Sequence, residues 1–231
     1  MPTKHSSEKD LLAVSNDRIQ SLSRRNFLGY IGGASALLIT AAACKKDKVT
    51  MDSGIDLGKG DIGVLNYAYT LEQIEAAFYT KVFQSPYAYM TAAENSLLGD
   101  IRDHEIAHRE FFKAALGTAV LPTLELDFSS INFGSRDSVL ATAKAFEDLG
   151  VSAYNGAGML LTNPDYLLLA GKIVSVEARH AAYIRDLISN GTFADDLDIN
   201  ALDISRSPSQ VFAIAGVYVK TKLNISNLPT S

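Results

Sequence analysis

Two short stretches, Glu105-Ile-Ala-His108 and Glu177-Ala-Arg-His180, decide the fold of this chain. Each places a carboxylate and an imidazole three residues apart, which brings both side chains to one face of a helix. Apolar residues surround both stretches at helical spacing, so these faces are expected to be buried. Burying a carboxylate and an imidazole is costly unless something compensates them. The repeated arrangement therefore predicts one shared compensator, a metal centre.

The first helix of the predicted bundle precedes the stretch Glu105–His108, and the second helix contains it. Residues 61–84 show helical spacing, with Asp61 as the expected N-cap and Ser85-Pro86 as the end. The second helix begins at a capping box, Thr91-Ala-Ala-Glu94, and ends near Leu116. Gly117 then suits the position after a helix end.

The second half of the chain repeats this plan. Residues 118–134 form a long connection, which suits a crossover along the outside of a bundle. The third helix starts near Ser135, and the fourth opens at Asn163-Pro164, with proline at the first helical position. Ser207-Pro-Ser-Gln210 predicts a short fifth helix that reaches Val219. The fold class is therefore all-α, a four-helix bundle with a long crossover between helices two and three and a short C-terminal fifth helix.

The first and third helices each offer an inward glutamate. A di-metal carboxylate site in a four-helix bundle takes one Glu from each of two helices and Glu-x-x-His from each of the other two. Glu72 and Glu147 lie on the apolar stripes of these helices, and Tyr79 and Tyr154 each follow seven residues later. The tyrosines are interpreted as core residues, as hydrogen-bond partners of the ligands or as radical traps. Glu75 lies one turn from Glu72, so the helix-one ligand stays open between these two.

Four phrases carry a resemblance to a known family: residues 71–79, 104–108, 146–154 and 175–180. Together they resemble the ferritin-like superfamily, specifically the exported ferritin-like domain proteins that include plant desiccation-related proteins. The resemblance covers residues 61–190 and implies two metal ions, with Fe favoured and Mn or Zn as alternatives. It implies the following ligands: Glu72 and Glu147 as terminal carboxylates, Glu105 and Glu177 as bridging carboxylates, and His108 and His180 as one imidazole per metal. His104 is expected at the surface or in packing, because its neighbour Glu105 points inward.

The N-terminal residues read as an export signal. Ser23-Arg24-Arg25-Asn26-Phe27-Leu28 is a twin-arginine signature, and an apolar run to Ala43 follows it. The expected organisation is a signal peptide (1–43), a polar tether (44–60) and a ferritin-like domain (61–231). Cys44 is the only cysteine, so it is interpreted as a lipid attachment site. Ordinary cleavage before Cys44 and an uncleaved membrane anchor stay as alternatives. We therefore expect twin-arginine export to the periplasm and anchoring to a membrane through Cys44.

The charge of the exported chain excludes one class of partner. Without residues 1–43 the chain has 16 basic and 23 acidic residues, a formal charge of −7. No basic patch with interleaved aromatic residues occurs, so nucleic acid is not an expected partner. A homo-oligomer is compatible with the sequence.

Three functions compete on these observations. The first is a di-iron oxidase or peroxidase, or a dimanganese catalase-like enzyme, acting on Fe(II), O₂ or H₂O₂ in iron handling or oxidative-stress defence. The second is metal storage without sustained turnover. The third is a stress-protective protein whose metal centre serves its stability. The motifs identify the site, and they leave the reaction open.

Overall fold

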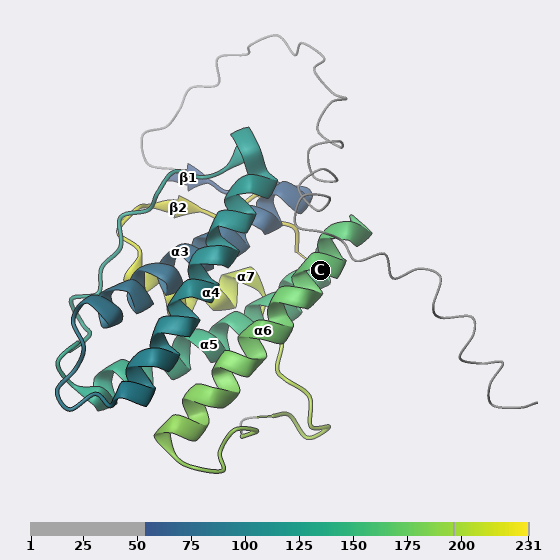
Figure 1. The fold of residues 1–231 in the computed structure, drawn as a ribbon. Helices are drawn as coiled ribbons and strands as arrows, with labels where there is room; N and C mark the ends of the chain where they lie inside the picture. The colour runs from purple at the N-terminus through teal and green to yellow at the C-terminus, as the bar shows by residue number, and fades with distance from the viewer. Residues whose placement is uncertain (1–53, 196, 231) are drawn as a thin grey trace, which may run out of the picture. The chain divides into compact units, whose positions relative to one another are not determined.

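Four long helices form the body of the protein in a computed structural model that describes residues 54–195 and 197–230. They lie side by side as a bundle (Figure 1). Their bounds are α3 (Gly60–Gln84), α4 (Ala92–Leu116), α5 (Arg136–Gly158) and α6 (Pro164–Ile188). A short helix, α7 (Pro208–Ala215), packs against α5. The predicted all-α bundle with a short fifth helix is confirmed, although this helix ends at Ala215, and a 3₁₀ turn, η3 (Gly216–Tyr218), follows it before Val219.

The helices associate as two hairpins, α3 with α4 and α5 with α6, and α3 also packs against α5. The segment between α4 and α5 is the expected crossover. It starts with a 3₁₀ turn, η2 (Gly117–Ala119), and continues as irregular chain. Leu126 in this segment pairs with Val219 beyond α7 in an isolated antiparallel bridge. The crossover is therefore tied to the C-terminal part of the chain.

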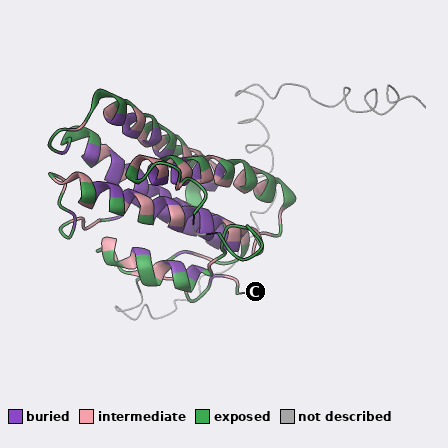
Figure 2. Cartoon of the chain, turned by 90° about the horizontal axis from the view of Figure 1, so that it is seen from below, coloured by how far each residue is buried: buried purple, intermediate pink, exposed green. Residues whose placement is uncertain are grey.

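Burial differs between the helices in a way that positions the site. Helix α3 is buried around most of its circumference, whereas α6 buries mainly one face. Figure 2 shows the buried residues gathered between the helices and the exposed ones on the outside. Aromatic rings fill much of this core: Phe78 contacts Tyr79, Phe128, Phe133 and Phe146 at centroid distances of 5.0–6.2 Å. A helix as deeply buried as α3 can carry polar side chains inward only where partners receive them.

Most of the predicted helix starts are confirmed, and one is wrong. Side chains accept the first backbone N–H groups of their helices at Thr91, Ser135, Asn163 and Ser207. Asp61 is not an N-cap, because α3 starts earlier and Lys59 holds the cap position without a side-chain hydrogen bond. The Asp61 carboxylate instead accepts hydrogen bonds from the backbone N–H groups of Thr162, at 2.7 Å, and Asn163, at 2.9 Å. It thereby joins the first turn of α3 to the start of α6.

A small parallel sheet was missed by the sequence analysis. Strand β1 (Ile55–Asp56) pairs with β2 (Leu223–Asn224), and Leu57 beside it is fully buried. The end of the segment expected as a polar tether is therefore part of the fold. Two-residue strands carry no alternating pattern from which they could be predicted.

The export signal, the start of the expected tether and Cys44 lie outside the described residues. In the part of the chain that the structure describes, no helix has both the length and the apolar character required to cross a bilayer.

Candidate metal centre

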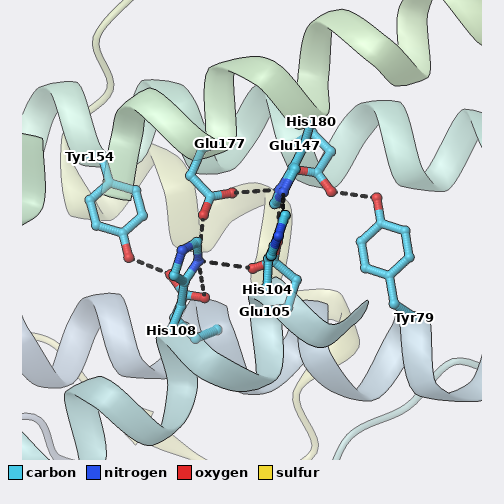
Figure 3. Close-up of polar contacts among 9 residues, drawn as sticks. Tyr79, His104, Glu105, His108, Glu147, Tyr154, Glu177 and His180 are labelled. Atoms are coloured by element: carbon cyan, nitrogen blue, oxygen red, sulfur yellow. Dashed lines mark hydrogen bonds and ion pairs between the residues drawn. The ribbon is translucent and has the colours of Figure 1, made fainter. Parts of the chain in front are cut away.

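The six predicted ligands meet in the interior of the bundle, five of them labelled in Figure 3. Glu72 comes from α3 and Glu147 from α5, while α4 and α6 supply the remaining four. The four carboxylate side chains have no exposed surface. The side chains of His108 and His180 are 13% and 6% exposed, but their Nδ1 atoms, which face the carboxylates, are buried.

In the first group of ligands, three carboxylates lie close to Nδ1 of His108. Its Nδ1 lies 2.9 Å from Glu177 Oε1 and 3.5 Å from Glu105 Oε2. Glu72 Oε2 is also 3.5 Å from this nitrogen. The three carboxylates and the imidazole thus direct one atom each toward a common point.

His180 is the centre of the second group. Its Nδ1 lies 2.8 Å from Glu105 Oε1 and 3.4 Å from Glu147 Oε2. Glu177 Oε2 is more distant, at 3.8 Å. In each of the two groups, the candidate ligand atoms all lie within 4.8 Å of one another.

Glu105 and Glu177 belong to both groups. Each directs one carboxylate oxygen toward His108 and the other toward His180. Glu72 contacts only His108, and Glu147 contacts only His180. Two equivalent positions that share two carboxylates are the arrangement expected for a pair of metal ions. The structure brings the predicted ligands together; their binding of metal stays a prediction.

The two tyrosines hold the unshared carboxylates in a crossed arrangement. Tyr79 of α3 donates its hydroxyl hydrogen to Glu147 Oε1 of α5, and Tyr154 of α5 donates to Glu72 Oε1 of α3. Burial, and then the charge of the neighbouring glutamate, raises the pKa of both hydroxyls well above the ordinary value. Both tyrosines therefore remain protonated hydrogen-bond donors.

The electrostatics of the metal-free site favour protonated histidines. Burial opposes the charged imidazolium, but contacts with Glu105, Glu147 and Glu177 outweigh it and raise the pKa of His180 to about 12. Burial likewise opposes the charged form of His108, but contacts with Glu105, Glu177 and Glu72 outweigh it and raise the pKa of His108. Burial raises the pKa of Glu147 to about 7, whereas contacts with both histidines outweigh burial at Glu177 and lower its pKa to about 2.

The donor set fits two divalent cations. Several buried atoms that face the site have no hydrogen bond of normal geometry within the described structure: Glu72 Oε2, both oxygens of Glu105 and Glu177, Glu147 Oε2, and Nδ1 of His108 and His180. Carboxylate oxygens with one imidazole per position suit Fe, Mn or Zn. Four carboxylates also carry the formal charge that two divalent ions would balance.

Glu75 is a further buried carboxylate of α3, and it was the alternative helix-one ligand. The structure places Glu72 in the His108 group and leaves Glu75 outside both groups. Burial, followed by the charges of the other glutamates, raises the pKa of Glu75 well above its ordinary value. Gly150 of α5 makes room for it, since a Cβ there would lie 3.2 Å from Glu75 Oε1 and 3.6 Å from Glu177 Oε2.

His104 takes part in the site, although the sequence analysis assigned it to the surface or to packing. The residue is exposed, yet its Nδ1 lies 2.9 Å from His180 Nε2 and the two rings stack at a centroid distance of 5.2 Å and an angle of 11°. Burial, and then the charges of His180 and His108, lowers the pKa of His104. Helical spacing within α4 could not reveal this contact, because the contact joins an exposed residue of α4 to a ligand on α6.

Two large cavities of the protein lie away from these ligands. One, of about 440 Å³, is lined by residues that include Arg185, Phe193 and Arg206; the other, of about 480 Å³, lies beside Pro208 and Leu228. None of the six ligands lines either cavity. The volumes of these two cavities therefore give no reason to expect a large organic substrate at the candidate metal centre.

The comparison with known proteins agrees with this geometry. Residues 60–190 match the model of the ferritin-like domain family, a range that contains all six ligands. No curated protein matches the sequence.

Proposed function

The chain belongs to the ferritin-like domain family, and from that premise we propose that it is a di-metal carboxylate protein that reacts with Fe(II), O₂ or peroxide. One observation carries the proposal: Glu105 and Glu177 each offer one oxygen to His108 and the other to His180. A buried glutamate that served packing alone would not need to pair its two oxygens with two different histidines. Two cations sharing both carboxylates explain it.

Two sets of four residues would bind these two ions, and the sets have Glu105 and Glu177 in common. Glu72, Glu105, His108 and Glu177 hold one, and Glu105, Glu147, Glu177 and His180 hold the other. Tyr79 and Tyr154 restrain the two unshared carboxylates through hydrogen bonds across the bundle. Two bound irons would supply two electrons to O₂ or H₂O₂ together.

The shape of the site supports a small substrate. Its carboxylates are fully covered, and among the six ligands only the two histidines have any exposed side-chain surface. A ligand must therefore approach past the histidines of α4 and α6, and the surrounding apolar core limits how much water follows it. Fe(II), O₂ and H₂O₂ are small enough for such an approach.

Export is a second part of the proposal, and it is supported by sequence alone. The twin-arginine signature and the single cysteine after the apolar run favour a periplasmic protein, anchored to a membrane if Cys44 carries a lipid. Mass spectrometry of the mature N-terminus tests this directly. A lipid-modified Cys44 supports anchoring, an unmodified N-terminal Cys44 supports ordinary cleavage, and an intact Met1 in the exported fraction contradicts both.

The experiment that tests the reaction uses the metal-loaded chain. Fe(II) is added without oxygen, the iron content per chain is measured, and the sample is mixed rapidly with O₂ or with H₂O₂. The Glu105→Gln/Glu177→Gln double variant removes the shared carboxylates, and Glu110→Gln is the matched control, since Glu110 is an exposed carboxylate of the same helix.

The outcomes separate the candidate functions. Two irons per chain with rapid oxidation in the wild type and in Glu110→Gln, but not in the double variant, support the proposal. Two irons without accelerated oxidation favour metal holding over catalysis. Absence of bound metal in the wild type refutes the di-metal centre.

A further inference from the structure

The two imidazole ligands of the proposed centre differ in what lies behind them. His180 directs Nδ1 toward the carboxylates, and its Nε2 meets Nδ1 of His104 at 2.9 Å (Figure 3). His108 also directs Nδ1 toward the carboxylates. Within residues 54–195 and 197–230, no hydrogen bond to the second ring nitrogen of His108 is found.

The sequence explains the difference. His104 immediately precedes Glu105 of the first motif, whereas Val176 immediately precedes Glu177 of the second. The side chain of valine has no hydrogen-bond acceptor. The two motifs therefore differ at the position directly before the glutamate.

An acceptor behind His180 has a definite chemical consequence. An imidazole that binds a metal through Nδ1 must carry its proton on Nε2, and a hydrogen bond from that N–H fixes the tautomer and the ring orientation. His104 Nδ1 is placed to accept this hydrogen bond. The nearly parallel stacking of the two rings, at 11°, further limits rotation of His180.

We propose that His104 is a positioning residue for His180, and that it makes the two metal positions unequal, with the His180 position binding the more tightly. The inference rests on the proposed di-metal function and extends it to the order of metal binding. The first cation then occupies the position formed by Glu105, Glu147, Glu177 and His180, and the second occupies the His108 position.

Exposure makes His104 a favourable residue to change. Its side chain lies at the surface of α4, outside the apolar core, so replacing it leaves the bundle packed. His104→Phe keeps a ring for stacking and removes the acceptor. His104→Asn removes the ring and keeps an acceptor oxygen near the position of Nδ1. Val176→Ala, at the corresponding position of the second motif, is the control.

The test is a Co(II) titration of the full chain, followed by visible absorption and calorimetry. His108→Ala and His180→Ala backgrounds isolate one position each, so each His104 substitution is measured at a known position. In the His108→Ala background, His104→Phe is expected to lower Co(II) affinity by about 10-fold or more, the range measured for such supporting partners. His104→Asn is expected to stay close to the unsubstituted affinity, and Val176→Ala to change neither position.

A spectroscopic signature accompanies the affinity. In the Zn(II)-loaded chain, the Nε2–H proton of His180 should give a protected NMR signal in the wild type and in His104→Asn. His104→Phe should lose that signal while the amide spectrum of the bundle is retained.

The inference is overturned if His104→Phe binds both ions as the wild type does, or if it weakens binding in the His180→Ala background instead. It is also overturned if His104→Asn is as impaired as His104→Phe, since the acceptor would then be irrelevant. A wild-type chain that binds no Co(II) refutes the proposed function itself, whereas two ions bound with unchanged affinity in His104→Phe refute only the role of His104.

Discussion

Loading the site with Co(II) or Zn(II) is expected to raise the melting temperature of the protein substantially. The six ligands come from four helices, so only the folded chain brings them together, and a cation that binds only the folded state stabilises it. A free cation concentration of 100 times Kd contributes about 2.7 kcal/mol per position, or about 5 kcal/mol when each of the two positions is saturated to that extent. In a domain of this size, about 5 kcal/mol corresponds to about 10–20 °C.

The assay is thermal unfolding of the chelator-treated chain with and without added metal, at concentrations set by a prior titration. The Glu105→Gln/Glu177→Gln variant should lose most of the shift, because its neutral amides cannot be shared by two cations as carboxylates are. An equal shift in the wild type and in this variant would refute the reasoning, since the metal would then be acting elsewhere on the chain.

Three further predictions concern individual residues. Glu72→Gln should weaken metal binding at one position, whereas Glu75→Gln should leave both intact, because Glu75 lies outside both ligand groups; a titration that shows the reverse would move the ligand to Glu75. The metal-free protein should lose stability as pH rises above about 7, because folding raises the pKa of His180 from 6.5 to about 12. The stabilisation that His180 contributes is fully present only below pH 6.5. Thermal unfolding between about pH 6 and pH 9 checks this, and a melting temperature that rises with pH would contradict it. Gly156→Ala should destabilise the protein by about 1–3 kcal/mol, because a Cβ there would overlap a backbone carbonyl of the C-terminal segment; Gly171→Ala, with open space around it, is the matched control in denaturant unfolding and should not destabilise.

The sequence predicted the elements whose patterns are local. Helix starts at Thr91, Ser135, Asn163 and Ser207 were found because each cap lies within three residues of the N–H group that it accepts. The inward faces of the four helices were found because apolar spacing and buried glutamates coincide. The six candidate ligands follow from those faces, and the structure brings all six together.

Features that depend on distant parts of the chain were not predictable in this way. Asp61 has the chemistry of an N-cap, but its carboxylate accepts hydrogen bonds from residues about a hundred positions away, at Thr162 and Asn163. The strand pairing of Ile55 with Leu223 is likewise set by the whole fold.

His104 illustrates the same limit at the site. Its helical phase correctly places it on an exposed face of α4, but no local pattern states that α6 brings His180 to that face. Pairing one helix face with another requires the helix packing, which the sequence pattern does not specify.

The central claim is that Glu105 and Glu177 are shared by two metal ions. The most direct test is the electron paramagnetic resonance spectrum of the chain saturated with Mn(II), recorded together with its metal content. Two ions that share carboxylates should give the spectrum of a spin-coupled pair at two manganese ions per chain. A spectrum of isolated Mn(II) at saturation, with either one or two ions bound, would contradict a shared centre.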